Sequence, residues 1–139
     1  MLDVLARIPM YKLFRATGRP RLLPLNLTVS VTYRCNSRCL TCNVYNRKAD
    51  ELTAEEFDRI FRSLGRAPYW YTMSGGEPFL RTDLPRICES AFRRGSPGII
   101  NIPTNGLLAA RIPAMLDDIA RRFPAAQVNS ILSIDGVMP

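Results

Sequence analysis

The sequence contains no histidine and only four cysteines among its 139 residues. Zinc sites usually take four ligands, drawn as pairs from cysteine and histidine. Cys88 lies far from the other three cysteines, so the sequence offers no such set and a zinc site is disfavoured. A signal peptide is also disfavoured, because Arg7, Pro9 and Lys12 interrupt any apolar core near the N-terminus. This argues against a secreted protein held together by disulfides.

No apolar run is long enough to cross a membrane. The sequence is 47% hydrophobic and 22% charged, which is typical of a globular domain, and 139 residues are enough for one hydrophobic core. The net charge of +7 comes mostly from scattered arginines and not from a lysine-rich arm, so nucleic acid is a disfavoured partner. We expect a cytoplasmic protein, since clustered cysteines in a reducing compartment favour metal binding.

Residues 1–24 differ from the rest of the chain. Their apolar and basic residues can form a short basic amphipathic helix, which we expect to break at Pro9 and to lead into a linker at residues 18–20. Docking on the rest of the chain is favoured over binding to a membrane surface, because the proline weakens any long amphipathic face. Residues 25–139 are predicted to form the main domain.

Cys35, Cys39 and Cys42 are the most informative residues. A tight loop can point three such thiolates at one iron-sulfur cluster, and a four-iron cluster held by three cysteines keeps one iron open for a small molecule. A non-catalytic iron-sulfur electron carrier or a zinc-binding module is the alternative. Cys88 falls on the apolar face of a predicted helix and is interpreted as a core residue.

Strand and helix patterns alternate along the main domain in units of about 30 residues, which predicts a parallel sheet. The strands are expected at residues 25–32, 69–74, 99–102 and 128–134, and the helices at about residues 53–65, 83–95 and 112–123. Thr28, Ser30 and Thr32 share one side of the first strand. That side either lines a hydrated cavity within a curved sheet or belongs to a half-exposed edge strand.

Polar motifs follow each predicted strand, at the edge where parallel sheets build their sites. They are the cysteine triplet, Gly75-Gly76-Glu77-Pro78, Thr104-Asn105-Gly106 and Ser133-Ile134-Asp135-Gly136. Together, in this order, they resemble the radical S-adenosylmethionine (SAM) enzyme superfamily, and the general pattern is similar to its SPASM-type maturases. The resemblance implies an α/β fold, a partial (β/α) barrel of parallel strands. About four of six βα units would be present, so the barrel would be truncated at the C-terminus, as a fragment or as one part of a split enzyme.

The resemblance also implies a function. Cys35, Cys39 and Cys42 would hold a [4Fe-4S] cluster whose fourth iron binds SAM, and reductive cleavage of SAM would give a 5′-deoxyadenosyl radical that abstracts hydrogen from a substrate, a peptide or a small molecule. An electron donor such as flavodoxin or ferredoxin would be a partner. No catalytic side chain is assigned. The residues expected to contact SAM are Gly75, Gly76, Glu77, Pro78, Thr104, Asn105, Ser133 and Asp135.

One position departs from the family pattern. Members usually carry an aromatic residue just before the third cysteine, where it packs against adenine, but this chain has Thr41. Tyr45 or another ring is expected to take that role.

Overall fold

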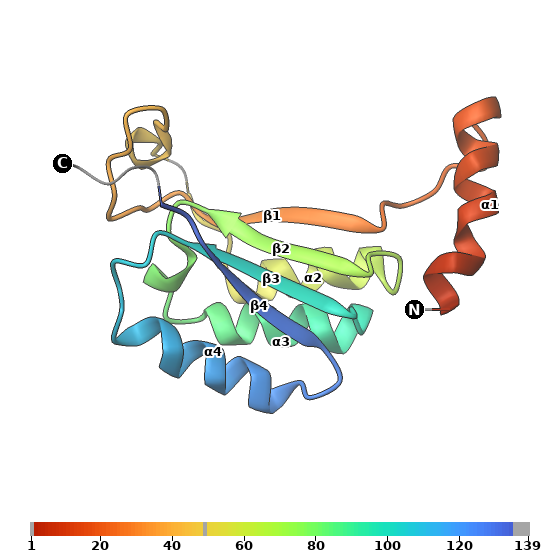
Figure 1. Cartoon of the computed structure of the whole chain (residues 1–139). Coiled ribbons are helices and arrows are strands. Elements are labelled where there is room, and N and C mark those ends of the chain that lie inside the picture. The colour runs from red at the N-terminus through yellow and green to blue at the C-terminus, as the bar shows by residue number, and fades with distance from the viewer. Residues whose placement is uncertain (1, 49, 135–139) are drawn as a thin grey trace.

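A computed structural model of the chain describes residues 2–48 and 50–134. Four strands alternate with helices after a separate N-terminal helix (Figure 1). The elements are α1 (Leu2–Thr17), β1 (Asn26–Thr32), the 3-10 helix η1 (Val44–Asn46), α2 (Ala54–Leu64), β2 (Trp70–Gly75), the 3-10 helix η2 (Pro78–Leu80), α3 (Leu84–Gly95), β3 (Ile99–Thr104), α4 (Arg111–Arg122) and β4 (Gln127–Leu132).

The strands form one sheet in the order β1-β2-β3-β4, and every neighbouring pair is parallel. Helices α2, α3 and α4 all lie on one face of the sheet, and no described helix covers the other face (Figure 1). The predicted α/β fold with parallel strands is therefore confirmed. Its helices run back across the same face, as expected for consecutive strand-helix units of a partial barrel.

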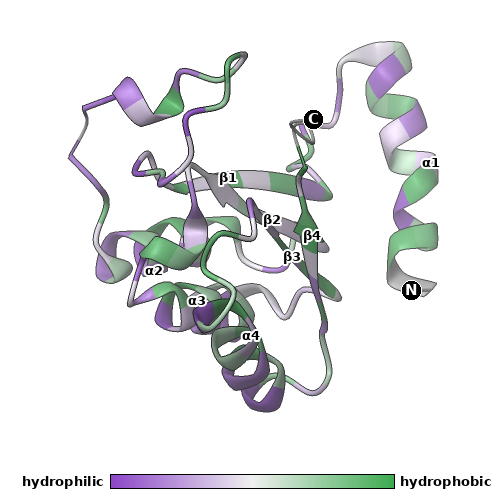
Figure 2. Ribbon diagram, turned by 60° about the vertical axis from the view of Figure 1, so that its left-hand side comes forward, coloured by the Kyte–Doolittle hydropathy of each residue, from purple (hydrophilic) through white to green (hydrophobic). Residues whose placement is uncertain are grey.

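The hydrophobic core lies between the sheet and these three helices, where the ribbon is green on the inner sides of the helices (Figure 2). Alternate residues of the strands enter it, such as Tyr71 and Met73 of β2 and Ile100 and Ile102 of β3. Cys88 of α3 is fully buried in this core, as predicted, and burial raises the pKa of its thiol to about 12. A thiol in that environment stays protonated and packs as a small apolar group.

A row of polar side chains crosses the opposite face of the sheet. The strand register aligns Thr28, Thr72, Asn101 and Asn129 in one row across all four strands. Asn101 is only 5% exposed, and its side-chain oxygen has no hydrogen-bond partner among the described residues. A polar row that crosses the whole sheet favours the wall of a hydrated cavity over a half-exposed edge strand, because the polarity is not confined to β1.

The N-terminus of α2 is closed by a capping box, which the pattern Thr53-Ala54-Glu55-Glu56 predicts. Thr53 accepts a hydrogen bond from the Glu56 amide, and the Glu56 carboxylate accepts one from the Thr53 amide at 2.9 Å. This satisfies two backbone donors of the first turn. The cap fixes where α2 begins, eight residues after the end of η1.

Arg81 joins the end of β1 to the start of α2. Its guanidinium is nearly buried and donates to the carbonyl oxygens of Val31 at 2.7 Å and Leu52 at 2.9 Å. Asp83 pairs with the same guanidinium at 2.6 Å, and this hydrogen bond lowers the pKa of Asp83. Because the pair occupies its carboxylate, Asp83 makes no side-chain cap at α3.

Helix α1 differs from the prediction, because it runs through Pro9 without a break. Leu5 and Pro9 both lie on the exposed side of α1, so water can bond the Leu5 carbonyl that Pro9 leaves without a donor. Arg7 attaches the helix to the rest of the chain by donating to the carbonyl oxygen of Ala67 at 3.0 Å, and the Tyr11 hydroxyl donates to that of Leu23. No described helix is both long enough and apolar enough to cross a membrane.

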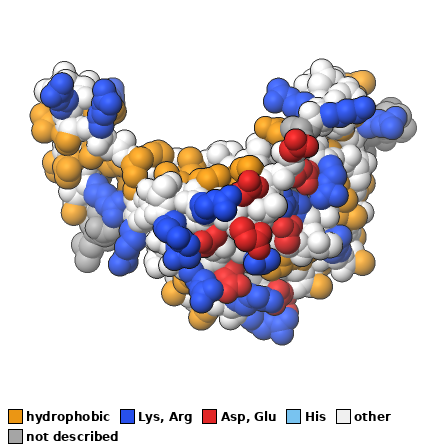
Figure 3. Space-filling view, turned by 180° about the vertical axis from the view of Figure 1, so that it is seen from behind, with side chains coloured by type: hydrophobic (Ala, Val, Ile, Leu, Met, Phe, Trp, Pro, Cys, Tyr) orange, Lys and Arg blue, Asp and Glu red, His pale blue; other side chains and the backbone are white. Residues whose placement is uncertain are grey.

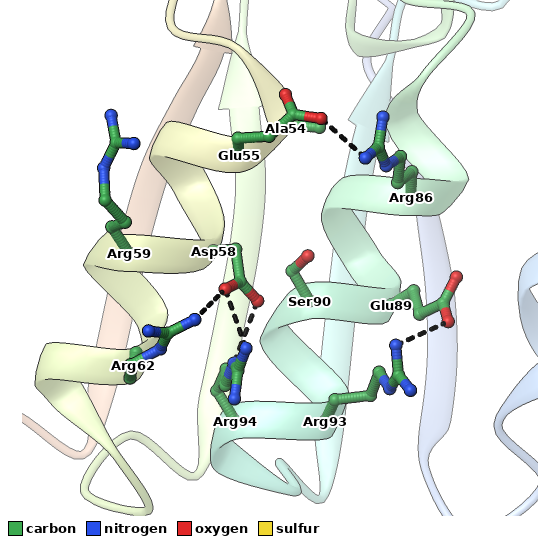
Figure 4. A pocket seen from close by; sticks show the side chains of 10 residues that line it. All are labelled: Ala54, Glu55, Asp58, Arg59, Arg62, Arg86, Glu89, Ser90, Arg93 and Arg94. Carbon is green, nitrogen blue, oxygen red and sulfur yellow. Dashed lines mark hydrogen bonds and ion pairs between the residues drawn. The ribbon is translucent and has the colours of Figure 1, made fainter.

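A charged groove of about 580 Å³ lies on the outer surface of α2 and α3 (Figure 4). Asp58 bonds Arg94 and Arg62, each at 2.9 Å, and Glu55 pairs with Arg86 at 2.6 Å. The hydrogen bonds from Arg94, followed by that from Arg62, outweigh desolvation and lower the pKa of Asp58 to about 2. The pairs Asp58–Arg94 and Glu55–Arg86 link the two helices. The groove lies on the helical layer, away from the strand ends.

Candidate functional site

The segments that follow β1, β2, β3 and β4 meet at one edge of the sheet, at the upper left of Figure 1. The first is the cysteine loop, residues 33–43, and the second is residues 76–80. Residues 104–106 form the third, and Ser133 begins the fourth. The structure therefore brings together the four motifs predicted from the sequence. Asp135 lies outside the described residues.

Gly75 and Gly76 lie against the backbone at the start of the cysteine loop. The Gly76 amide donates to the Thr32 carbonyl oxygen at 2.8 Å, and the Glu77 amide donates to that of Arg34 at 2.8 Å. A Cβ atom on Gly75 would lie 2.1 Å from the Thr32 oxygen, and one on Gly76 would lie 2.1 Å from the Arg34 oxygen. The glycines are needed for this contact between neighbouring loops, which the sequence could not reveal.

Glu77 connects the β2 and β3 ends. Its carboxylate is fully buried and accepts hydrogen bonds from the Thr104 hydroxyl at 3.0 Å, the Asn105 amide at 2.8 Å and the Phe79 amide at 3.2 Å. The Thr104 hydroxyl also accepts from the Gly106 amide at 3.1 Å. Both side chains are thus fully used inside the protein, and they hold the two loops together.

Asn105 continues this connection to the cysteine loop. Its side-chain amide donates to the Asn36 oxygen at 2.8 Å and lies 3.8 Å from the Cys35 sulfur. Its own oxygen accepts from the Leu107 amide at 3.0 Å. The Ser133 amide donates to the Thr104 carbonyl oxygen at 2.8 Å, which adds the β4 end to the same group.

The three loop cysteines lie on irregular backbone and form no disulfide, whereas Cys88 is buried in the core. Ser37 contacts two of them. Its amide donates to the Cys35 sulfur at 3.4 Å, and its hydroxyl lies 3.3 Å from the Cys39 sulfur. Cys42 is more exposed and lines a separate hollow. Within residues 2–48 and 50–134, no three cysteine, aspartate or glutamate side chains are arranged to hold one metal ion.

The predicted convergence of the thiols is therefore not present in this conformation. The donor set still suits a thiolate-bound cluster, because three cysteines outside any disulfide lie within eight residues on a loop that no core packing restrains. Metal ligands on such loops are commonly drawn together when the metal binds. The loop's fixed part is its base, where residues 32–34 bond to Gly76 and Glu77.

The base of the cysteine loop is also held by Glu51, which the sequence analysis missed. Arg34 pairs with Glu51 at 3.2 Å, and the Thr32 hydroxyl donates to the same carboxylate. Burial acts to raise the pKa of Glu51, but the hydrogen bonds from Thr32 and Arg34 outweigh it and the net shift is downward. Only its position just before the capping box marked this glutamate in the sequence.

Two hollows flank the cysteine loop. One, of about 500 Å³, is lined by Cys39, Thr41, Asn105 and Ser133 among others. The second, of about 380 Å³, lies on the Cys42 side. Its lining includes Tyr33, Cys42, Arg47, Ser74 and Gly75. Tyr33 is the aromatic residue among those that line this hollow, and Tyr45 is not one of them.

The sequence is similar to that of known proteins. The family model of the radical SAM superfamily matches residues 29–133. The GTP 3′,8-cyclase of Nitrobacter hamburgensis is 36% identical over 104 residues, covering 69% of this chain and 30% of the relative. The GTP 3′,8-cyclase of Acidothermus cellulolyticus is 35% identical over 124 residues, covering 82% of this chain and 33% of the relative. The chain spans about a third of the length of these curated relatives.

Two solved structures share the fold. The crystal structure of Streptococcus suis SuiB bound to S-adenosylmethionine matches with a TM-score of 0.68 and 19% identity, over 88% of this chain and 28% of that one. The crystal structure of BtrN in complex with AdoMet and 2-DOIA matches with a TM-score of 0.56 and 20% identity, over 71% of this chain and 44% of BtrN. The chain belongs to the radical SAM superfamily, whose members use a [4Fe-4S] cluster and SAM.

Proposed function

We propose that this chain is the part of a radical SAM enzyme that binds the cluster and SAM and cleaves SAM reductively. The observation that carries the proposal is the joining of four strand-end segments at one edge of the sheet, the first of which bears three cysteines. Main-chain and buried side-chain hydrogen bonds hold these segments in a fixed order. Such an arrangement positions a cofactor before any reaction begins.

Cys35, Cys39 and Cys42 are the proposed cluster ligands. When bound and reduced, the cluster would supply the electron that cleaves SAM to methionine and a 5′-deoxyadenosyl radical, which abstracts hydrogen from the substrate. Residues 32–34 keep the loop base in place through Gly76 and Glu77 while the thiols move together. Cys88 contributes nothing to the site, because it is buried in the core.

SAM is proposed to bind beside the cysteine loop. Gly75, Gly76, Glu77 and Pro78 would contribute through their backbone, since the Glu77 carboxylate is already occupied inside the protein. Thr104 would act by holding Glu77. The side chains of Asn105 and Ser133 line the 500 Å³ hollow with Cys39 and are the proposed polar contacts. Asp135 is proposed for the same role from its place in the sequence.

The proposal is restricted to binding and cleavage of SAM. The matched region is about a third of the length of the GTP 3′,8-cyclases, so their substrate is not carried over to this chain. The polar row from Thr28 to Asn129 gives the open sheet face hydrogen-bonding groups suited to a polar ligand. The electron would come from a one-electron donor such as flavodoxin or ferredoxin, in the cytoplasm.

Anaerobic reconstitution with iron and sulfide, followed by electron paramagnetic resonance of the reduced protein, tests the proposal. We expect about four irons per chain and a spectrum that changes when SAM is added. The separate variants Cys35→Ala, Cys39→Ala and Cys42→Ala should each lose the cluster. Cys88→Ala is the matched control and should keep it, because that thiol is buried away from the loop.

Three results would contradict the proposal. A spectrum that ignores SAM would indicate an electron carrier. Preferential uptake of zinc would indicate a structural metal module. Loss of the cluster in Cys88→Ala equal to that in the loop variants, with its melting curve unchanged, would show that the assignment of the ligands is wrong.

A further inference from the structure

Positive charge is concentrated in one part of the chain. Residues 4–48 contain nine of the 19 lysines and arginines and none of the 12 acidic residues, whereas the later residues carry nearly balanced charge. In space, this segment forms α1, the linker to β1, β1 and the cysteine loop. Blue side chains accordingly gather on both raised ends of the molecule, while red and blue alternate over the helices between them (Figure 3).

Helix α1 contacts the rest of the chain with one side only. Val4, Arg7, Tyr11 and Phe14 are half-buried on that side. On the other side, Leu5, Pro9 and Leu13 follow one another at four-residue spacing, which places them on one exposed stripe. The exposed apolar side chains of this region are Leu5 at 54%, Leu13 at 52%, Met10 at 46%, Ile8 at 41% and Leu23 at 47%.

Cations border this stripe. Lys12 and Arg15 are exposed on α1, and Arg19 and Arg21 are exposed on the linker that follows. Lysine and arginine next to an exposed leucine stripe can keep their charged ends in a polar headgroup layer while the leucines enter the layer below. No carboxylate between residues 4 and 48 opposes contact with an anionic surface.

We propose that α1 binds the surface of an anionic lipid bilayer, with Leu5, Met10 and Leu13 inserted and Lys12 and Arg15 at the headgroups. Arg38, Arg47 and Lys48 of the other raised end add to the attraction at longer range. The helix lies in the interface and does not span it, which agrees with its 16-residue length.

Other occupants fit the same surface less well. Nucleic acid would use the cations but would leave Leu5 and Leu13 in water. A second copy of the chain would bring two α1 helices together, each with three cations and only one acidic residue, Asp3, so repulsion between like charges opposes that contact. An anionic bilayer is the one surface that meets both the apolar stripe and its basic border.

Vesicle co-sedimentation tests the proposal with the full chain. The wild-type protein should bind phosphatidylcholine vesicles that contain roughly 30% phosphatidylglycerol, should not bind pure phosphatidylcholine, and should release at high salt. Leu5→Glu/Leu13→Glu should reduce the partition coefficient at least ~10-fold, because two inserted side chains become charged. Lys12→Glu/Arg15→Glu should reduce it by at least roughly 30-fold, because each cation lost from the membrane surface weakens binding about fivefold.

Matched controls lie on α2 and just after it. Ile60→Glu changes an exposed apolar residue of α2, and Arg59→Glu/Arg66→Glu changes the net charge as much as the α1 pair does. Both controls should retain vesicle binding to within a small factor of wild type. Circular dichroism and thermal melting of every variant separate loss of binding from loss of folding.

Several results would overturn the proposal. The proposal is wrong if the wild-type protein fails to bind the anionic vesicles. It is also wrong if the Leu5→Glu/Leu13→Glu variant binds them as well as the wild type does. Equal loss in the Arg59→Glu/Arg66→Glu control would show that only total charge matters. Light scattering that finds a dimer, dissolved by the leucine substitutions and indifferent to vesicles, would identify a second copy as the occupant.

Discussion

The hydroxyl of Thr104 donates a hydrogen bond to the buried carboxylate of Glu77 at 3.0 Å. The two residues are 27 positions apart and come from the ends of neighbouring parallel strands. Two backbone amides, from Phe79 and Asn105, complete the set of donors around this carboxylate. These hydrogen bonds hold residues 76–80 against residues 104–106, so changes in either loop are expected to affect the other.

Glu77→Gln is expected to lower the free energy of unfolding by about 1–3 kcal/mol, because the new amide group directs hydrogens at groups that are themselves donors. Chemical denaturation measures the loss. Glu55→Gln is the matched control, since Glu55 pairs with Arg86 on the helical surface, and it should cost less than ~1 kcal/mol. Equal losses in the two variants would refute the role assigned to Glu77.

Gly76→Ala is expected to cost at least ~2 kcal/mol of stability, because its new Cβ would meet a backbone oxygen that cannot turn aside. The Arg34 oxygen lies 2.1 Å from that Cβ position. Gly18→Ala is the control: it has a positive φ of 71° but no atom within 4 Å of the added Cβ, so only about 1 kcal/mol of backbone strain is expected. Thermal melts of the two proteins would show the difference, and the reverse order would contradict the close contact.

Asp58 predicts an acid-sensitive link between α2 and α3. Its pKa in the folded protein, about 2, lies below the ordinary value of 3.8, so the unfolded chain binds the proton first as the pH falls. The stabilisation is therefore complete above the ordinary pKa and is lost as the pH falls through the folded pKa. Urea denaturation of wild type and Asp58→Asn, from about pH 6 down to pH 2.5, should show a steeper loss for wild type.

Asp117→Asn serves as the control for that comparison, because Asp117 pairs with Arg121 within a single helix and joins no two elements. Its stability should fall with pH nearly in parallel with wild type. If Asp58→Asn also follows wild type throughout, the link between the helices carries no pH-dependent stability.

Alkylation should separate the four cysteines. Iodoacetamide at neutral pH should modify Cys35, Cys39 and Cys42 in the folded, metal-free protein but not Cys88, whose pKa of about 12 and complete burial keep it unreactive. Mass spectrometry should find the fourth adduct only after denaturation. Labelling of Cys88 in the folded protein at the rate of the loop cysteines would mean that α3 is not packed as described.

Local sequence patterns predicted the elements well. The capping box at Thr53 and the alternation in β1 both rest on neighbours within four residues, and the structure confirms them. The order of the strand-end motifs was also predictable, because consecutive strand-helix units place each strand end at the same edge. The exact strand ends shifted by one or two residues, as at β4, which ends at Leu132.

Contacts between distant residues were not predictable. The need for glycine at position 76 depends on an oxygen of Arg34, and the burial of Arg81 depends on carbonyl groups of Val31 and Leu52. Nothing in the local sequence around these residues specifies such partners. Pro9 shows the reverse case: the local rule predicted a break, but its solvent-exposed position made the lost hydrogen bond tolerable.

The attachment of the cysteine loop at its base has a consequence for how this family can diversify. Residues 32 and 34 are held there through their carbonyl oxygens, which every amino acid provides. Substitutions between the three loop cysteines can therefore accumulate without displacing the point from which the loop departs. Natural variation or directed evolution can retune a cofactor's surroundings in this segment while the supporting scaffold stays the same.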